Sequence, residues 1–267
     1  MVSPTVLTLL LLTVAAHGAS AIFLDGASAI SLDINTTQIR HLDWVRVTFG
    51  GLKPNDLTAW LGVFSPSTAS TVRIPEQTCS YCNPPWTENA PLKFIMCGDI
   101  PGCLEAGEAN FDFRLENCFE DMKIALFTGG IETPTVLAES KAISFEDIDS
   151  PLRGHLTRTQ SPSEMMVIWA TREMNAGAGV KWGSSHGGPY TSFAPVIESH
   201  THTVADLCGK PANQHGWFDP HYWNYATITG LTPGISLVYY VYGSDKYGWS
   251  EEVIFPCLFD MTIEYDF

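Results

Sequence analysis

The sequence predicts an all-β protein in which two tandem β-sandwich modules follow an N-terminal signal peptide. Short runs rich in Val, Ile, Phe, Trp and Tyr recur along the chain, separated by residues such as Gly, Pro, Asn and Asp. Beyond the N-terminus, no window of helical length repeats its apolar residues every 3.6 positions. The 267 residues allow two domains of ordinary size, and 45% hydrophobic with 16% charged residues is a composition that supports packed cores.

Residues 1–21 predict the signal peptide. An apolar run from Val6 to Ala16 is broken only by Thr8 and Thr13, and small residues suited to signal-peptidase cleavage continue to Ala21. The run is shorter than the roughly 20 apolar residues that cross a bilayer. We therefore expect an exported, secreted protein without a membrane span.

The first module is expected over residues 22–148. Its apolar runs are short and end in Gly, Ser or Pro, as strands of a sandwich do. Residues 111–115 alternate strictly, so Phe111 and Phe113 are expected to face one core. The predicted strands are 44–49, 60–64, 111–115, 123–127, 136–138 and 142–145.

Residues 65–107 are expected to form an insertion in the first module, because they are rich in Pro and hold Cys79, Cys82, Cys97 and Cys103. Cysteines of an exported chain are expected to form disulfides, which would restrain so long a loop. The sequence contains seven cysteines, an odd number, so one thiol is left without a partner for a disulfide within the chain. A zinc site made from the same four cysteines is the alternative, and it is less favoured because thiolates rarely stay reduced outside the cell.

The second module is expected over residues 149–256, after acidic residues and a proline at 146–151 interrupt the strand pattern. Leu231, Pro233 and Gly234 form a turn signature ahead of a Tyr-rich strand, a pattern typical of immunoglobulin/fibronectin III-like β-sandwiches. Trp169 and Trp182 are predicted core residues. The predicted strands are 151–156, 164–171, 179–183, 224–229, 236–243 and 249–255.

The net negative charge of the chain argues against two classes of binding partner. A formal charge of −15 repels nucleic acid and anionic lipid, since binding either requires clustered cations. We therefore expect no nucleic-acid partner. The sequon Asn35-Thr36-Thr37 predicts N-glycosylation at Asn35 in an exported chain.

Several strings taken together resemble the large, plant-type purple acid phosphatases. Each string is short, but their order and approximate spacing match that family from about Leu42 to Phe255. The matching strings are residues 121–130, 163–171, 206–212, 216–220 and 229–234.

The resemblance implies a secreted phosphatase of phosphate monoesters. In that family one or two N-terminal β-sandwich modules precede a metallophosphoesterase domain, which holds Fe(III) together with Fe, Zn or Mn. The two metals bind the phosphate and generate the attacking hydroxide. A metallophosphoesterase domain and a second copy of the chain are thus the partners that the resemblance implies.

The family's metal-binding motifs are not reproduced in this sequence. Gly98-Asp99 begins like the first motif but lies in the cysteine-rich stretch, and the segment His200-Thr201-His202 mimics the last one inside the second sandwich. Residues 257–267 match nothing in the family. We therefore expect no catalytic, metal or cofactor residues in this chain, and expect the metallophosphoesterase domain to be missing from it.

Two groups of residues leave alternatives open. His200 and His202 could bind a transition metal, as could a surface cluster of His186, His215 and His221, although solvated loop histidines are the more common case. Trp217 and Trp223, with Tyr222 and Tyr225 nearby, could form an aromatic platform for a sugar or a partner domain, or they could be core residues.

Three functions follow, in order of preference. The first is the non-catalytic N-terminal region of a purple acid phosphatase. The second is a secreted β-sandwich module that binds a glycan or a protein. The third is a hydrolase that uses His200 and His202, and it is the least favoured because neither a G-x-S-x-G elbow nor a phosphate-binding glycine loop accompanies them.

Overall fold

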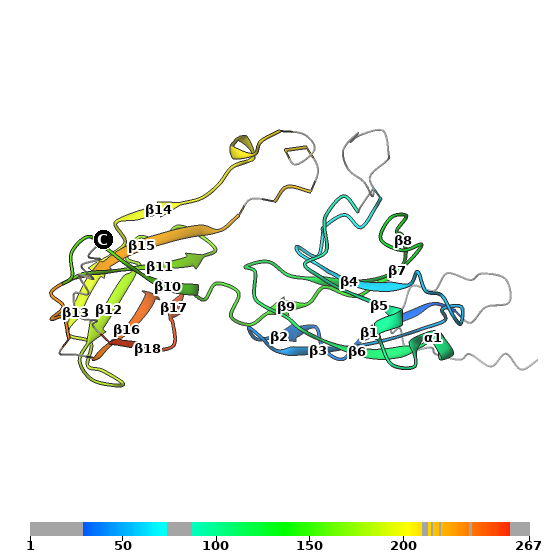
Figure 1. Ribbon diagram of the computed structural model, residues 1–267, viewed down its shortest axis with the longest axis horizontal. Helices are drawn as coiled ribbons and strands as arrows, with labels where there is room; N and C mark the ends of the chain where they lie inside the picture. The colour runs from blue at the N-terminus through cyan, green and yellow to red at the C-terminus, as the bar shows by residue number, and fades with distance from the viewer. Residues whose placement is uncertain are drawn as a thin grey trace, which may run out of the picture.

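Strands make up nearly all of the regular structure in the computed structural model, and the helices are single short turns (Figure 1). It describes residues 29–73, 87–209, 213–214, 216–218, 220–234 and 237–256. The predicted signal peptide, Cys79, Cys82 and the C-terminal segment 257–267 lie outside these ranges. Within them no helix has the length and apolar character that crossing a membrane requires. The predicted all-β fold class is confirmed.

Two sheets and a short parallel pair form the first module. One sheet has the order β1-β3-β6, the other β5-β4-β7-β8, and β2 pairs with β9. The strands are β1 (Ser31–Ile34), β2 (Gln38–Ile39), β3 (Trp44–Gly50), β4 (Trp60–Phe64), β5 (Lys93–Met96), β6 (Ala109–Arg114), β7 (Lys123–Thr128), β8 (Thr135–Glu139) and β9 (Ser144–Phe145), with turns η2 (Cys97–Asp99) and α1 (Cys103–Ala106).

The core of the first module lies between these sheets. Strand β3 alternates, with Val45, Val47 and Phe49 buried, and Phe113 of β6 joins them with Phe111 packed beside it, as predicted. Strands β4 and β7 are buried on both faces. Their outer face carries a second cluster in which the rings of Trp60 and Phe127 stack at 4.0 Å.

The expectation of an insertion over residues 65–107 is wrong for residues 93–96, whereas residues 74–86 of that stretch lie outside the described ranges. Strand β5 lies in it and pairs with β4 in the sandwich. The predicted disulfide is confirmed between Cys97 and Cys103, both of which are buried in the main core. This bond excludes both sulfurs from the alternative zinc site.

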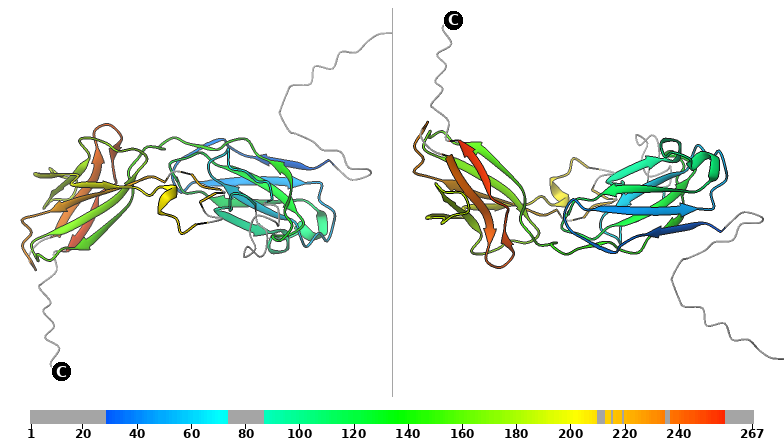
Figure 2. Two further views of the ribbon diagram at one scale, coloured as in Figure 1. Left: turned by 90° about the horizontal axis from the view of Figure 1, so that it is seen from above. Right: turned by 90° about the horizontal axis from the view of Figure 1, so that it is seen from below.

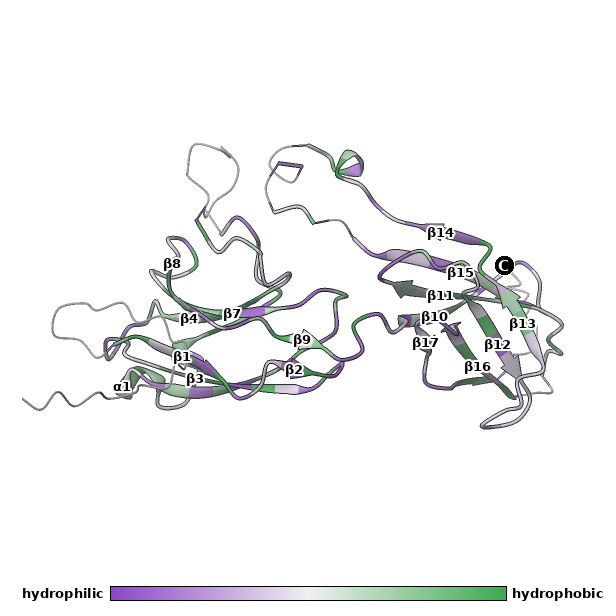
Figure 3. Cartoon of the chain, turned by 180° about the vertical axis from the view of Figure 1, so that it is seen from behind, coloured by the Kyte–Doolittle hydropathy of each residue, from purple (hydrophilic) through white to green (hydrophobic). Residues whose placement is uncertain are grey.

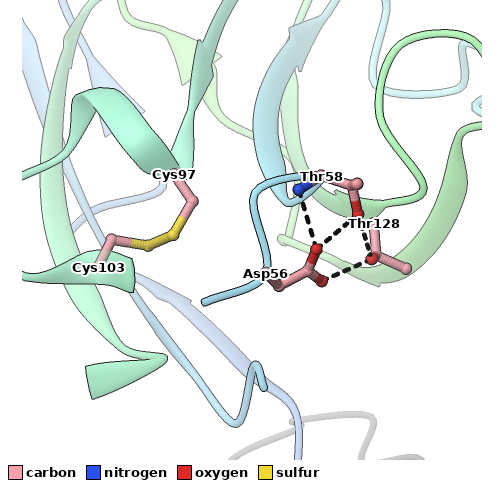
Figure 4. The surroundings of a disulfide bond; sticks show 5 residues. All are labelled: Asp56, Thr58, Cys97, Cys103 and Thr128. Carbon is pink, nitrogen blue, oxygen red and sulfur yellow. Dashed lines mark hydrogen bonds between the residues drawn. A yellow bond between two sulfur atoms is a disulfide. The ribbon is translucent and has the colours of Figure 1, made fainter. Parts of the chain in front are cut away.

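A carboxylate lies near the disulfide and ties the ends of β4 and β7 together (Figure 4). Asp56 accepts hydrogen bonds from the backbone N–H of Thr58 at 2.9 Å and from the hydroxyl of Thr128 at 2.7 Å. Burial raises the pKa of Asp56, but the hydrogen bonds from Thr58 and Thr128 outweigh it and leave that pKa below its ordinary value.

The second module is also a sandwich of two sheets. Their orders are β10-β11-β15-β14 and β13-β12-β16-β17, and β18 pairs with β16. The strands are β10 (Leu152–Arg158), β11 (Met165–Thr171), β12 (Gly179–Gly183), β13 (Ser192–Pro195), β14 (Glu198–His200), β15 (Tyr222–Ile228), β16 (Leu237–Ser244), β17 (Gly248–Trp249) and β18 (Val253–Pro256), with the turn η3 (Val204–Asp206).

Trp169 is fully buried in the core of the second module, and Trp182 packs against it half-buried, as predicted. Hydrophobic colour marks β11, β12 and β16, whose side chains build this core (Figure 3). Tyr242 of β16 bridges the two sheets, because its hydroxyl accepts a hydrogen bond from the Gly154 N–H of β10 at 3.1 Å. A Cβ atom at position 154 would overlap the Tyr242 ring, so glycine is required there.

The two modules lie end to end (Figures 1 and 2). A long connection from Thr201 to His221, here called the arm, joins β14 to β15 and extends from the second module toward the first (Figure 1). The modules therefore meet at the linker 146–151 and again along the arm.

Candidate functional site at the junction between the modules

Buried polar groups of the first module hold the linker in place. Asn117 is fully buried, and its side-chain amide donates a hydrogen bond to the Asp147 carbonyl oxygen at 2.8 Å. The Asn117 side-chain oxygen accepts the N–H of Phe119 at 2.7 Å, which closes a tight turn. The N–H of Asn117 in turn donates to Nδ1 of His41 at 3.1 Å. The linker thus begins as part of the first core.

Phe119 and Arg153 form the contact that crosses from one module to the other. Both have left-handed backbone conformations, with φ of 65° and 57°, which is uncommon for side chains of this size. The Arg153 guanidinium donates to the Asn117 carbonyl oxygen at 3.2 Å and lies 5.4 Å from the centre of the fully buried Phe119 ring. Strand β10 of the second module therefore contacts the loop before β7 of the first module through the Arg153 side chain.

Arg172 adds two ion pairs at the same place. Its guanidinium lies 3.5 Å from Asp149 of the linker and 3.9 Å from Glu120 of the first module. The side chains of all three residues are more than a third exposed, so each pair contributes at most about 1 kcal/mol. These charges orient the modules more than they stabilise the junction.

His221, at the end of the arm, completes the junction. Its ring meets the Phe119 ring edge to face, with centres 4.4 Å apart. Burial, together with the positive charges of Arg153 and Arg172, lowers the pKa of His221 to about 4. The imidazole is therefore neutral at neutral pH and packs as an uncharged aromatic ring.

The middle of the arm makes a separate contact with the first module. Gly216 has φ of +69°, and a Cβ atom there would overlap the carbonyl oxygen of Glu88. Nearer β14, the turn η3 is held by a capping box in which Asp206 accepts the Thr203 N–H at 2.7 Å. The arm is thus shaped by its own hydrogen bonds and lies directly against the 88–89 loop.

The predicted histidine cluster does not form between the two members that the structure describes. His186 is exposed, bonds to Glu252 and lies 5.8 Å from the Tyr239 ring, whereas His221 contacts Phe119. His215 lies outside the described residues. The reason is topological, because His186 follows β12 in the sheet that does not carry the arm.

His200, the last residue of β14, and His202, near the start of the arm, do lie together. Both are exposed, and their ring centres are 4.9 Å apart. No three His, Cys, Asp or Glu side chains come close enough to hold a metal ion anywhere in the described ranges. Gly98 and Asp99 lie in the turn η2 of the first module, where the described residues form no group of metal-binding side chains.

The aromatic residues predicted to form a platform, Trp217 on the arm and Tyr222, Trp223 and Tyr225 on β15, are half-buried. Trp223 and Tyr225 share the face of β15 opposite to Asn224 and Ala226, so they point away from the second core. The Trp223 ring lies 5.9 Å from the ring of His155. Trp217 is half-buried on the arm.

Asn35 is exposed at the end of β1. Its side-chain oxygen accepts the N–H of Arg46 at 2.9 Å. Glycosylation at this position stays a prediction.

Among the described cysteines, Cys118 and Cys208 are free thiols. Cys118 is half-buried in the junction, with its sulfur 3.5 Å from the Arg153 guanidinium, and burial raises the pKa of its thiol. Cys208 is exposed on the arm.

Reasoning from the sequence missed the junction. Phe119, Arg153 and His221 are far apart in the chain, and no periodic pattern connects them. The one local signal was Asn117 two residues before Phe119, an arrangement in which an Asn side chain bonds to a backbone N–H two residues on.

Family comparisons match both modules. Residues 29–147 match the Fn3-like domain from purple acid phosphatase, and residues 151–256 match the purple acid phosphatase N-terminal domain. The two matches meet at the linker that Asn117 holds.

Curated relatives carry the same family name. The chain is 30% identical to probable inactive purple acid phosphatase 27 of Arabidopsis thaliana, over 76% of this chain and 33% of that protein. It is 31% identical to probable inactive purple acid phosphatase 1 of the same plant, over 81% of this chain and 35% of that protein. The chain therefore spans about a third of the length of these relatives.

A solved structure agrees with these matches. A purple acid phosphatase isolated from yellow lupin (Lupinus luteus) seeds superposes with a TM-score of 0.73 at 26% identity, covering 84% of this chain and 40% of that one. The chain belongs to the purple acid phosphatase family, and its two modules are the N-terminal domains of that family.

Proposed function

We propose that these two modules are the secreted, non-catalytic N-terminal region of a purple acid phosphatase, which supports a metallophosphoesterase domain. The observation that carries the proposal is that two adjoining family domains occupy residues 29–147 and 151–256 and share one junction. A support must hold a fixed shape. The Phe119–Arg153 contact and the contact of the arm with the first module restrain the angle between the modules, and Asn117 fixes the start of the linker that joins them.

Catalysis is assigned to a domain other than these two. The family resemblance implies Fe(III) with Fe, Zn or Mn, and such a pair needs several His, Asp or Asn ligands around one point. The described residues contain no group of three His, Cys, Asp or Glu side chains that fits even one metal. We assign no metal ligand and no catalytic step to them.

The test is a phosphatase assay on the purified chain. With Fe, Zn or Mn added, the chain is expected to release no p-nitrophenol from p-nitrophenyl phosphate above a buffer blank. The variant His200→Ala/His202→Ala is the matched control, because these two histidines lie side by side where β14 meets the arm. Turnover that depends on added metal and is lost in this variant would replace the proposal with an arm-centred hydrolase.

Export and glycosylation are part of the same proposal. The exposed side chain of Asn35 and the buried Cys97–Cys103 disulfide are both compatible with the secretory pathway. In a eukaryotic secretory host the chain is expected in the medium, and Asn35→Gln is expected to remove a glycosidase-sensitive shift in its mobility. Retention in the cytosol with an unmodified Asn35 would contradict export.

The family resemblance also suggests a homodimer. Sedimentation of the purified chain at micromolar concentration tests this directly. A dimer at neutral pH is the expected result, and a monomer at every concentration would limit self-association to longer forms of the protein.

A further inference from the structure

His221 lies where three elements of the two modules converge. The Phe119 ring faces it from the first module, Arg153 from β10, and Arg172 from the loop after β11. Among the described residues, the titratable and charged groups of this junction are Arg153, Arg172, Glu120, Asp149 and the Cys118 thiol.

None of these groups would pair with a protonated His221. Glu120 and Asp149 are engaged with Arg172, at 3.9 and 3.5 Å. Arg153 binds the neutral Asn117 carbonyl and the Cys118 sulfur, so its charge is not balanced by a carboxylate within the described contacts. An imidazolium in this position would be a third cation beside two arginines, partly withdrawn from water and packed on a fully buried phenyl ring.

We propose that His221 is a pH-sensitive latch, which holds the two modules together while its ring is neutral and releases them when the ring takes up a proton. The geometry gives the reason: only separation of His221 from Phe119 would let water surround the charged ring. In the released state the modules stay connected through the covalent linker 146–151, whose beginning is held in the first module by Asn117.

The direction and size of the effect follow from proton linkage. The pKa of His221 is about 4 in the closed junction, against 6.5 for a solvated histidine. Between these values the open form binds a proton that the closed form does not, so acidification favours opening. If the whole of this pKa difference acts, the ratio of open to closed molecules is about 30-fold higher at pH 5 than at neutral pH. Screening by water around the half-exposed ring reduces this to about tenfold.

The molecule contains its own probe of opening. Cys118 is half-buried in the junction, whereas Cys208 is an exposed free thiol on the arm. The labelling rate of Cys118 divided by that of Cys208, measured by peptide mass spectrometry with a disulfide reagent active at acid pH, reports access to the junction. Dividing by the rate of an exposed thiol in the same molecule removes the dependence of thiol labelling on pH that the two sites share, so a change in the ratio reports opening of the junction.

The experiment compares the wild type with His221→Gln and with His155→Gln, a control on the neighbouring strand β10. The rate ratio is expected to rise about tenfold from pH 7.5 to 5.0 in the wild type and in the control, and to stay flat in His221→Gln. An equal rise in His221→Gln would overturn the proposal, as would a flat wild-type profile. A nuclear magnetic resonance titration that gives His221 a pKa above 6 would also overturn it, whatever the variants do.

Discussion

Removal of the Cys97–Cys103 disulfide should destabilise the first module by about 3 kcal/mol. The two cysteines are six residues apart, and closing so short a loop removes about 2 kcal/mol of chain entropy from the unfolded state. Both side chains are buried in the main core, at 3% and 0% exposure. Their sulfur atoms therefore contribute roughly 1 kcal/mol more through packing, which alanine would lose.

The assay is equilibrium unfolding in urea, followed by tryptophan fluorescence, to which the buried Trp60 of the first module contributes. The variant Cys97→Ala/Cys103→Ala is expected to unfold at a lower urea midpoint with an unchanged slope. The variant Cys208→Ser, which alters an exposed free thiol on the arm, is the matched control and should shift stability by less than about 0.5 kcal/mol. A double variant as stable as the wild type would refute the account of this disulfide as part of the core.

Three further substitutions test other parts of the structure. Phe119→Ala removes a fully buried ring from the junction and is expected to cost about 3 kcal/mol in thermal or urea unfolding; a loss below 1 kcal/mol would contradict its role there. Gly154→Ala pushes a methyl group into the Tyr242 ring and should cost about 1–3 kcal/mol, whereas a neutral effect would show that the sheets can shift apart. Asp56→Asn should cost about 1–2 kcal/mol at pH 7. Because the pKa of Asp56 is lowered in the fold, its stabilising effect is present above the ordinary carboxyl pKa and is lost as the pH falls through the lowered value. The difference in stability between variant and wild type should therefore shrink on acidification, and a difference that does not change with pH would contradict this.

The strands with strong patterns could be predicted from the sequence. The alternation of β3 and the apolar runs of β4 and β7 located three central strands, because burial on one or both faces dictates such patterns. Trp169 was a sound prediction for the same reason, since a large ring on an apolar strand is most stable in the core.

The strands without such patterns could not be predicted. β5 lies in a Pro-rich, Cys-rich stretch and is only half-buried, while β13 ends in Pro195 at a sheet edge. An edge strand pairs with one neighbouring strand instead of two, so its sequence shows a weaker pattern of apolar residues. The sequence therefore predicted an insertion where β5 lies and no strand where β13 lies.

The junction could not be predicted for a different reason. The left-handed conformations of Phe119 and Arg153 are imposed by the tertiary contacts around them, not by the preference of either residue. The position of His221 depends on the path of the arm, which brings a residue next to Phe119 across about a hundred positions in sequence. Local patterns contain neither kind of information.

The central claim is that the two modules form one scaffold with a fixed mutual orientation. Residual dipolar couplings measured on the weakly aligned chain at pH 7.5 test it most directly, because they give an alignment tensor for each module separately. The account predicts the same tensor, in magnitude and direction, for residues 29–147 and 151–256. Two different tensors would contradict it, since they would mean that the contacts of Phe119, Arg153 and His221 do not hold the modules together in solution.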